Sequence, residues 1–293
     1  MKRGTTMEVF TKNIKDIQPS QLYISKAKLL KVEEYLNSVS IADIEPLPIK
    51  KIGKYTFFTD GHTRAFALMK RGIEEIKVYW DEDDLNWIQY LICIDWCNKE
   101  GIKDIRDLNN RVVNDEDYKK LWDDRCDIMQ QRSMENLDYY LNIKIVPQAK
   151  EKSDICELVL RALPDWFGIE EAIKEYIDGV KDTTFLSAYI GEVPIGFLSI
   201  KEHNEFTSEI YVMGILKEFH RRGIGKRLMK AAEDVLINQN KIFLTVKTLS
   251  SSHPDEGYRK TREFYRAVGF YPLEEFPELW GKENPCLLMA KKL

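Results

Sequence analysis

The sequence lacks the features of membrane-bound and secreted proteins. No apolar run approaches membrane-spanning length, and the opening residues MKRGTTMEVFTKN hold no apolar signal core. Cysteine is scarce, with five scattered residues, and this odd number favours free thiols in a cytoplasmic protein. Cys93 and Cys97 are four apart, but no nearby His or Cys pair completes a zinc set, so no metal site is predicted.

A strong excess of charge of either sign is also missing. The 44 Lys and Arg residues face 48 Asp and Glu residues, and the net charge is −4. This balance argues against non-specific nucleic-acid binding as the main activity, and DNA is not a predicted partner. What is present is a chain of 293 residues, 44% hydrophobic and 31% charged, which indicates a soluble globular protein with room for two domain cores.

The chain is organised around one stretch, Ser208–Ala231, which reads SEIYVMGILKEFHRRGIGKRLMKA. Residues 210–216 are apolar and β-branched, as in a buried strand, and residues 217–225 form a basic turn with two glycines. From Lys226 onward apolar residues recur at helical spacing. A strand, a glycine turn and a helix N-terminus together form an anion site, because the first helical N–H groups are free and carry partial positive charge.

The residues of this turn specify the anion. Gly223 and Gly225 let the backbone approach a bound group closely, and Arg221, Arg222 and Lys226 add full positive charges. We therefore predict a phosphate or pyrophosphate ligand. The spacing fits neither the P-loop nor the dinucleotide pattern GxGxxG.

The segment HRRGIG at residues 220–225 resembles the pyrophosphate loop of the GNAT N-acetyltransferases, Gln/Arg-x-x-Gly-x-Gly/Ala, with His220 as a departure. Two further segments resemble that family, the hairpin YIGEVPIGFLSI (189–200) and FYRAVGF (264–270); Tyr258 departs where many members have Asn. The resemblance covers residues 143–293 in element order and implies a mixed-sheet acyltransferase domain with acetyl-CoA as cosubstrate. The cofactor-binding residues that it implies are Ile215, Leu216, His220, Arg221, Arg222, Gly223, Ile224, Gly225 and Lys226.

Acetyl transfer to an amine by direct attack needs a held thioester, a polarised carbonyl, a base and an acid. By resemblance, backbone groups near Ile215 and Leu216 bind the pantetheine arm, and an N–H there is the oxyanion donor. Tyr265 matches the family's general acid, with a packed core tyrosine as the alternative. Glu209 is the candidate base, as in histone-acetylating members. Its alternatives are an exposed strand-end carboxylate without a role, or Tyr211 or Glu205 as the base.

The tail, residues 250–289, resembles a GNAT sub-branch with a closing hairpin Trp-x-x-x-Asn-Pro-Cys. Trp280, Asn284 and Pro285 are candidates for a substrate-side wall, and Cys286 for strand core. A core position for Trp280 is the alternative. The acceptor amine, whether a small molecule or a protein, and the oligomeric state are not given by the sequence.

A second strand–turn–helix anion site is predicted in the N-terminal half. Residues 55–59 read as a strand, and Asp60, Gly61, His62, Thr63 and Arg64 follow at the start of a helix. Gly61 allows the tight turn, the N–H groups of residues 62–64 could face a phosphate, and Arg64 could pair with it bidentately. The alternative is a structural turn with Asp60 as a helix cap.

SQLYIS (20–25) and TDGHTRAFALMKRGIEEIKVYW (59–80) resemble the ParB/sulfiredoxin-like fold over about residues 11–80. The resemblance implies nucleotide phosphates against the Asp60–Arg64 turn. His62 stands where sulfiredoxin needs a reactive Cys, which excludes that chemistry. The DGH-x-R turn is closest to a free-serine kinase of this fold, with Asp60 as candidate carboxylate and Glu33, Glu34 and Glu45 as weaker ones.

We therefore predict an α+β protein of two domains. Residues 1–142 form a ParB/sulfiredoxin-like α/β domain whose acidic extension, 81–138, is helical; residues 143–293 form the GNAT domain. In the extension we expect helices over 85–97, 104–111 and 117–131, and a linker over 132–138. The leading function is an acetyl-CoA-dependent N-acetyltransferase. The alternatives give the N-terminal domain nucleotide binding, as a phosphotransferase or sensor, or a binding role without chemistry.

Overall fold

The computed structural model describes residues 8–53 and 55–293, and the chain divides into two compact units. The first unit runs to Tyr140 and includes Ile190–Glu192; the second consists of Leu141–Tyr189 and Val193–Leu293. No helix of the described residues is long and apolar enough to cross a membrane.

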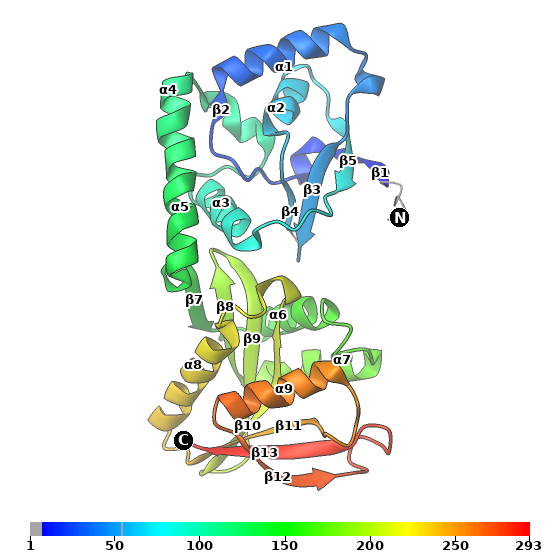
Figure 1. The fold of residues 1–293 in the computed structure, drawn as a ribbon, viewed down its shortest axis with the longest axis vertical. Helices are drawn as coiled ribbons and strands as arrows, with labels where there is room; N and C mark the ends of the chain where they lie inside the picture. Colours follow the sequence, from blue (N-terminus) through cyan, green and yellow to red (C-terminus); the bar gives the residue numbers. More distant parts are fainter. Residues whose placement is uncertain (1–7, 54) are drawn as a thin grey trace. The chain divides into compact units, whose positions relative to one another are not determined.

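The first unit is built on a four-stranded sheet of order β1-β5-β3-β4 (Figure 1). The β3–β5 pair is parallel, and the β1–β5 and β3–β4 pairs are antiparallel. Two helices, α1 and α2, pack on one another beside it. The bounds are β1 Val9–Asn13, β3 Leu47–Ile52, β4 Tyr55–Phe58, β5 Glu75–Trp80, α1 Lys26–Ser38 and α2 His62–Lys70, with a two-residue pair, β2 Ile24–Ser25 and β6 Val112–Val113.

The helical extension of this unit differs from the prediction in two places. Residues 105–110 form a 3-10 helix instead of an α-helix, because a capping box between Asp104 and Asp107 closes a short turn. The predicted linker at 132–138 is mostly helical, since nothing between residues 115 and 135 is Gly or Pro. The bounds are α3 Trp87–Lys99, α4 Asp115–Tyr118, a π turn Lys119–Asp123, α5 Asp124–Glu135 and a 3-10 helix Leu137–Tyr139.

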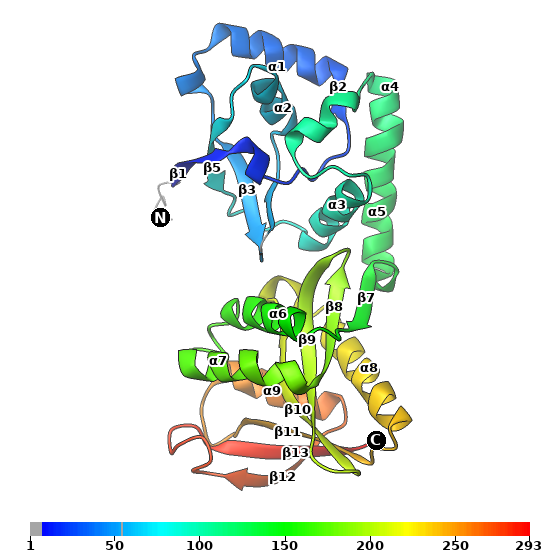
Figure 2. The same cartoon turned by 180° about the vertical axis from the view of Figure 1, so that it is seen from behind.

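The second unit is a seven-stranded sheet of order β12-β13-β11-β10-β9-β8-β7. Helices α6 and α7 cover one face, and α8 and α9 the other (Figures 1 and 2). Stacked Phe185 and Phe197, with centroids 4.9 Å apart, lie in its core. The bounds are β7 Leu141–Ile145, β8 Thr184–Ile190, β9 Val193–Glu202, β10 Thr207–Ile215, β11 Phe243–Leu249, β12 Tyr271–Phe276, β13 Cys286–Lys292, α6 Ala149–Arg161, α7 Glu170–Gly179, α8 Ile224–Asn238 and α9 Glu256–Ala267.

The two central strands part halfway along their length. β10 and β11 are parallel, and their pairing is limited to Thr207–Ile210 of β10 against Phe243–Val246 of β11. Beyond that point β10 pairs only with β9, β11 pairs only with β13, and a β-bulge at Tyr211 marks the divergence. Figure 1 shows the unit from the side of α8 and α9, the helices that flank the gap. The gap leaves one edge of each strand without a strand partner.

Contacts on both sides hold the strands apart. On the β10 side, Gly214 lets α6 approach so closely that an added Cβ would lie 2.8 Å from Val159 Cγ1. On the β11 side, the buried guanidinium of Arg262 in α9 donates to the carbonyls of Leu249 and Ser250 at 2.8 and 3.0 Å. The opening is therefore fixed by packing on β10 and by hydrogen bonds on β11.

Candidate active site

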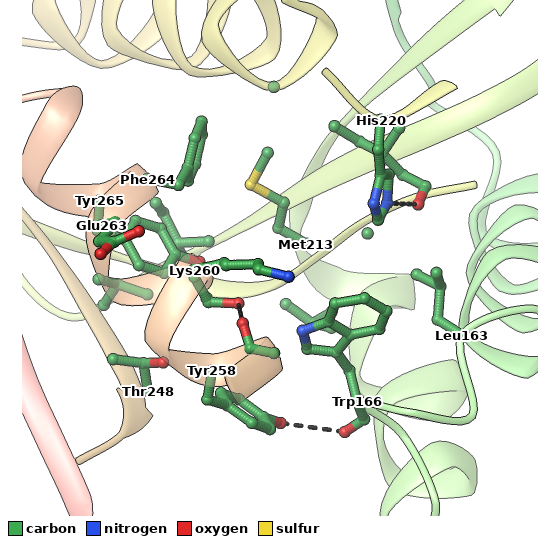
Figure 3. A pocket seen from close by; sticks show the side chains of 18 of the residues that line it. Leu163, Trp166, Met213, His220, Thr248, Tyr258, Lys260, Glu263, Phe264 and Tyr265 are labelled. Atoms are coloured by element: carbon green, nitrogen blue, oxygen red, sulfur yellow. Dashed lines mark hydrogen bonds between the residues drawn. The ribbon is translucent and has the colours of Figure 1, made fainter. Parts of the chain in front are cut away.

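A cavity of about 1170 Å³ lies at the gap between β10 and β11 (Figure 3). All of its lining residues belong to the second unit. They come from β10 (residues 210–215), the loop before α8 and its first turn, β11 (246–248), α9, the α6–α7 loop and α7, with Trp280 from the β12–β13 connection. The cavity is therefore built from elements that are distant in sequence and meet at the parted strands.

The basic loop forms one end of the cavity. Gly223 is the N-cap of α8 with φ +77°, and no side chain caps the first turn. Arg221 also has a positive φ, 61°. The first N–H groups of α8 are therefore free of a side-chain partner. Of the predicted loop residues, His220, Arg221, Gly223, Ile224, Gly225 and Lys226 line the cavity, and Arg222 does not.

The charges at this end remain available to a ligand. Within the described part of the chain, Arg221 and Lys226 form no ion pair, whereas Lys217 pairs with Asp165 at 3.1 Å. Gly225 fits against Phe264 and Ile215, where an added Cβ would lie 3.1 Å from Phe264 Cε2. This packing holds the first turn of α8 close to β10. Arg221 and Lys226, unpaired among the described residues, therefore flank the N-terminus of α8 at this end of the cavity.

His220 braces the loop. Its Nε2 lies 2.7 Å from the Ile215 carbonyl oxygen, and its ring meets Trp166 edge-on with centroids 5.7 Å apart (Figure 3). A neutral or protonated imidazole can donate this hydrogen bond. His220, the departure noted in the sequence, therefore links the loop to the end of β10.

The backbone of β10 narrows the choice of the predicted oxyanion donor. The Leu216 N–H donates to the Ile195 carbonyl at 2.9 Å, so it cannot be an oxyanion donor. N–H groups of successive strand residues point to opposite edges. The N–H groups of Ile215 and Met213 therefore point to the edge that faces the gap. The side of β10 to which each N–H points depends on the pairing with β9, which the sequence pattern did not reveal.

Tyr265 lies in the wall formed by α9. It is buried, lines the cavity, and packs against Phe264 and Phe270 with centroids 5.4 and 5.5 Å away. Burial raises the pKa of the phenol well above its usual value, so the hydroxyl keeps its proton at neutral pH. No hydrogen bond of this hydroxyl is found in residues 8–53 and 55–293.

Glu209 is buried and is not among the lining residues. Its two carboxylate oxygens lie 2.8 and 2.9 Å from Lys247 Nζ, and Oε2 also lies 2.6 Å from His203 Nε2. Lys247 lines the cavity, so the carboxylate reaches the cavity through that ammonium. Of the alternative bases, Tyr211 lines the cavity, while Glu205 is exposed and outside it.

The predicted substrate wall is found only in part. Trp280 lines the cavity, whereas Asn284 and Pro285 do not, and Cys286 is buried in β13. Sequence reasoning missed Trp166, Phe167, Tyr176 and Tyr258 as lining residues. The only local signal was the segment LPDWFG (163–168), an apolar stretch between two helices. Tyr258, the other departure, donates from its hydroxyl to the Trp166 carbonyl at 3.0 Å.

In the first unit, the Asp60–Arg64 turn begins α2 as predicted, with Gly61 as N-cap at φ +78° and no side-chain cap. His62 is buried, and its Nε2 accepts a hydrogen bond from the Ser20 N–H at 3.0 Å. Burial lowers the pKa of His62 to about 4, so the ring is neutral at pH 7. Arg64 pairs with Glu45 at 3.3 Å, and Asp60 is exposed. The His62 side chain therefore serves the core.

The five cysteines, all within the described part of the chain, are free thiols. Among the described residues, no group of three or more His, Cys, Asp or Glu side chains could hold a metal ion.

A comparison with known protein families finds a match within the second unit. Residues 153–270 match the Acetyltransferase (GNAT) family. A stretch of 121 residues is 28% identical to an uncharacterized N-acetyltransferase of Chlorobaculum tepidum, covering 40% of this chain and 70% of that protein. The second unit therefore contains a GNAT-type N-acetyltransferase domain, and the predicted enzyme class is confirmed.

Solved structures also resemble this unit. An aminoglycoside 6'-N-acetyltransferase complexed with coenzyme A has a TM-score of 0.42 and 17% identity, covering 52% of this chain and 96% of that one. A GNAT family acetyltransferase from Elizabethkingia anophelis with acetyl-CoA bound has a TM-score of 0.39 and 18% identity, covering 53% and 99%.

The buried His62 gives a pH dependence to stability. Its pKa is about 4 in the folded protein and 6.5 ordinarily, so the unfolded chain binds a proton that the folded chain excludes between these values. The contribution to stability is complete above pH 6.5 and is lost as the pH falls toward 4. As the pH falls through this range, the unfolding temperature of the wild type should therefore fall more steeply than that of His62→Gln. Equal pH profiles for the two proteins would contradict this prediction.

Proposed function

We propose that the second unit transfers an acetyl group from acetyl-CoA to an amine by direct attack in a ternary complex. The observation that carries this proposal is the gap between β10 and β11, which ends at the uncapped N-terminus of α8. A ligand with a pyrophosphate at one end and an amide-bearing arm at the other fits both features. The free helix N–H groups suit the anion, and the open edge of β10 suits the amides.

The residues present fit acetyl-CoA. Arg221 and Lys226, which form no ion pair within the described part of the chain, would neutralise the pyrophosphate beside the first turn of α8. The strand-edge groups of Met213 and Ile215 would hydrogen-bond to the arm, and one of these N–H groups, in place of that of Leu216, would donate to the carbonyl oxygen of the thioester. When bound, the cosubstrate supplies an activated acyl group.

Tyr265 is proposed as the general acid. The amine nitrogen forms a bond to the acyl carbon, the carbon–sulfur bond breaks, and the sulfur leaves with the electron pair. The buried phenol, which retains its proton because its pKa is raised, then donates that proton to the sulfur.

Glu209 is proposed as the base, acting through its neighbours. Its carboxylate is held by Lys247 and His203, and only Lys247 lines the cavity. The network therefore leads from the cavity to the half-exposed His203, which gives the amine proton a path of hydrogen-bonded groups toward solvent. In this arrangement water carries the amine proton to Lys247 as the ammonium passes one of its own protons to the Glu209 carboxylate, so the carboxylate takes up the net proton.

The proposal is tested by calorimetry and kinetics on the full chain. Acetyl-CoA and CoA should both bind, and CoA should be released in the presence of an amine. Tyr265→Phe should lower kcat about a hundredfold, because proton transfer to the leaving sulfur is lost, while the Kd of acetyl-CoA stays within about twofold. Tyr271→Phe, on the exposed strand β12, is the matched control. Absence of acetyl-CoA binding would overturn the proposal; unchanged kcat would remove Tyr265 from it.

A second function is proposed for the first unit: nucleotide binding at the Asp60–Arg64 turn, as in the ParB/sulfiredoxin-like fold. The observation in its favour is the uncapped start of α2 at Gly61, where an added Cβ would lie 2.7 Å from Leu47 Cδ2. Arg64 stands one turn further along and could exchange Glu45 for a phosphate. This site would serve a phosphotransferase or a nucleotide sensor.

Titration of ATP, ADP and CTP into the full chain tests the second function. Arg64→Ala should weaken nucleotide binding about tenfold or more, because a bidentate phosphate contact is lost. Lys31→Ala, an exposed cation on α1, should leave binding unchanged. If none of the three nucleotides binds the wild type, the first unit has no such site.

A further inference from the structure

A set of aromatic rings lines the cavity beside the proposed base network. We call this set the aromatic wall; its members are Trp166, Phe167, Tyr176, Tyr211 and Tyr258. Phe167 meets Tyr176 at 6.0 Å between centroids and at 90°, and Tyr176 meets Tyr211 at 5.4 Å and 69°. All five side chains are half-buried. Phe167, Tyr176 and Tyr211 thus form a row of contacting rings, and the Tyr258 hydroxyl joins the wall by donating to the Trp166 carbonyl. The members come from the α6–α7 loop, α7, β10 and α9 and present a mostly apolar surface.

Local backbone features place the Tyr211 side chain in this wall. Tyr211 is the extra residue of the β-bulge in β10, which turns its side chain away from the ordinary alternation of the strand. Gly179, at the end of α7, leaves the space that the ring of Tyr211 fills; an added Cβ there would collide with the phenol oxygen. The wall is thus fixed by a bulge in one element and a missing side chain in another.

The carboxylates that line the cavity are already engaged. Asp165 pairs with Lys217 at 3.1 Å, and Asp255 caps α9 by accepting from the Tyr258 N–H at 2.7 Å. Glu256 and Glu263 both pair with Arg259. In the described residues, therefore, no lining carboxylate is left without a partner for an acceptor with several positive charges.

The wall itself carries no negative charge. Burial raises the pKa of Tyr176 to about 12 and also raises the pKa values of Tyr211 and Tyr258, so all three phenols are neutral at pH 7. The adjacent charge, the Lys247 ammonium, is compensated by Glu209. An apolar surface gains free energy by covering apolar groups, and a buried polycation without carboxylate partners loses it.

We propose that the acceptor is a primary amine on an apolar, ring-bearing body, whose ring lies on the aromatic wall and whose nitrogen faces the Lys247–Glu209 pair. This inference rests on the proposed acetyl transfer and names its substrate class. The wall selects against polyamines and amino sugars, because these would place several charges against uncharged rings, while the carboxylates that line the cavity already have partners.

The test measures CoA release by the full chain with acetyl-CoA and three amines: 2-phenylethylamine, spermidine and kanamycin. The kcat/KM for 2-phenylethylamine should exceed the other two at least about tenfold, because only its ring covers the wall. A preference for spermidine or kanamycin would overturn the substrate class but leave acetyl transfer standing. Failure to bind CoA in calorimetry would instead overturn the proposed function.

Two variants examine the wall directly. Tyr211→Ala and Tyr176→Ala should each raise KM for 2-phenylethylamine about tenfold and leave the Kd of CoA within about twofold, since each ring contacts the acceptor and not the cosubstrate. Tyr271→Ala removes an exposed tyrosine of β12 and is the matched control. An unchanged KM in both wall variants would contradict the proposal.

A second inference rests on an independent observation, the hydroxyl of Thr248. Thr248 is 3% exposed and lines the cavity, yet its Oγ1 has no hydrogen-bond partner among the described residues (Figure 3). A buried hydroxyl without a partner destabilises the folded protein, and a valine of the same shape would not. Thr248 stands two residues beyond Val246, the last β11 residue paired with β10. Its hydroxyl therefore lies near the narrow end of the gap.

We infer that the Thr248 hydroxyl hydrogen-bonds to the thioester end of the bound cosubstrate. In this proposal the pantetheine arm enters the gap from the N-terminus of α8 and ends where β10 and β11 begin to pair. Its last amide, its sulfur and the acyl oxygen then lie beside Thr248 on β11. Each of these atoms except sulfur is a good hydrogen-bond partner for a hydroxyl. The ligand thus supplies the partner that the free protein lacks.

Thr248→Val separates binding from folding. The variant should unfold at the same temperature as the wild type or higher, because an unpaired buried hydroxyl is removed, while kcat/KM for acetyl-CoA falls about tenfold. Thr248→Ser should retain most of the activity. The matched control is Thr245→Val on the same strand, where the lost hydroxyl donates to the Ser208 carbonyl at 3.3 Å; it should lower stability and leave kcat/KM unchanged.

An unchanged kcat/KM in Thr248→Val overturns this inference. If the unfolding temperature of that variant is also lowered, the hydroxyl has a structural role instead. Calorimetry with CoA identifies the atom. A weaker Kd for CoA in Thr248→Val indicates the last amide, and a loss confined to acetyl-CoA turnover indicates the acyl oxygen. If the wild type binds neither molecule, the acetyl-transfer proposal fails as well.

Discussion

Backbone hydrogen bonding along one edge of β10 is the constraint on which the second unit depends. Beyond Ile210 this edge has no strand partner, and unpaired backbone groups require water or a ligand. The surroundings keep the edge open: α6 packs at Gly214, and Arg262 fixes the end of β11. The cavity, the basic loop before α8 and the buried Tyr265 all lie around the point where β10 and β11 stop pairing. An enzyme that binds an amide-bearing arm gains a ready partner there.

The sequence predicted the parts of the site that are local in the chain. The glycine and arginine turn at the start of α8 depends on neighbouring residues, so its pattern could be read directly. The direction of the Leu216 N–H could not, because it depends on pairing with β9. The partners of Glu209 likewise come from two other segments, including Lys247 on the adjacent strand. The aromatic wall was missed because its members are scattered over four elements that only the fold brings together.

The first unit shows the same division between local and tertiary information. The turn at Gly61 was predicted from its residue type, and the structure has it as the start of α2. The position of His62 was not foreseen: its ring points inward to the Ser20 N–H, so its side chain is not available to a phosphate at this turn. The likeness of this unit to the ParB/sulfiredoxin fold stays a prediction, because the matched family residues, 153–270, lie in the second unit.

Trp166 touches both halves of the cavity. Its ring meets His220 of the basic loop, and its carbonyl accepts from Tyr258 of the aromatic wall. A ligand bound at the loop and one bound at the wall would therefore both contact elements that Trp166 joins. Thermodynamic linkage makes any such effect reciprocal: the factor by which the cosubstrate alters acceptor affinity equals the factor by which the acceptor alters cosubstrate affinity. Through its indole ring and its backbone carbonyl, Trp166 thus gives this enzyme a physical means to couple the binding of its two substrates.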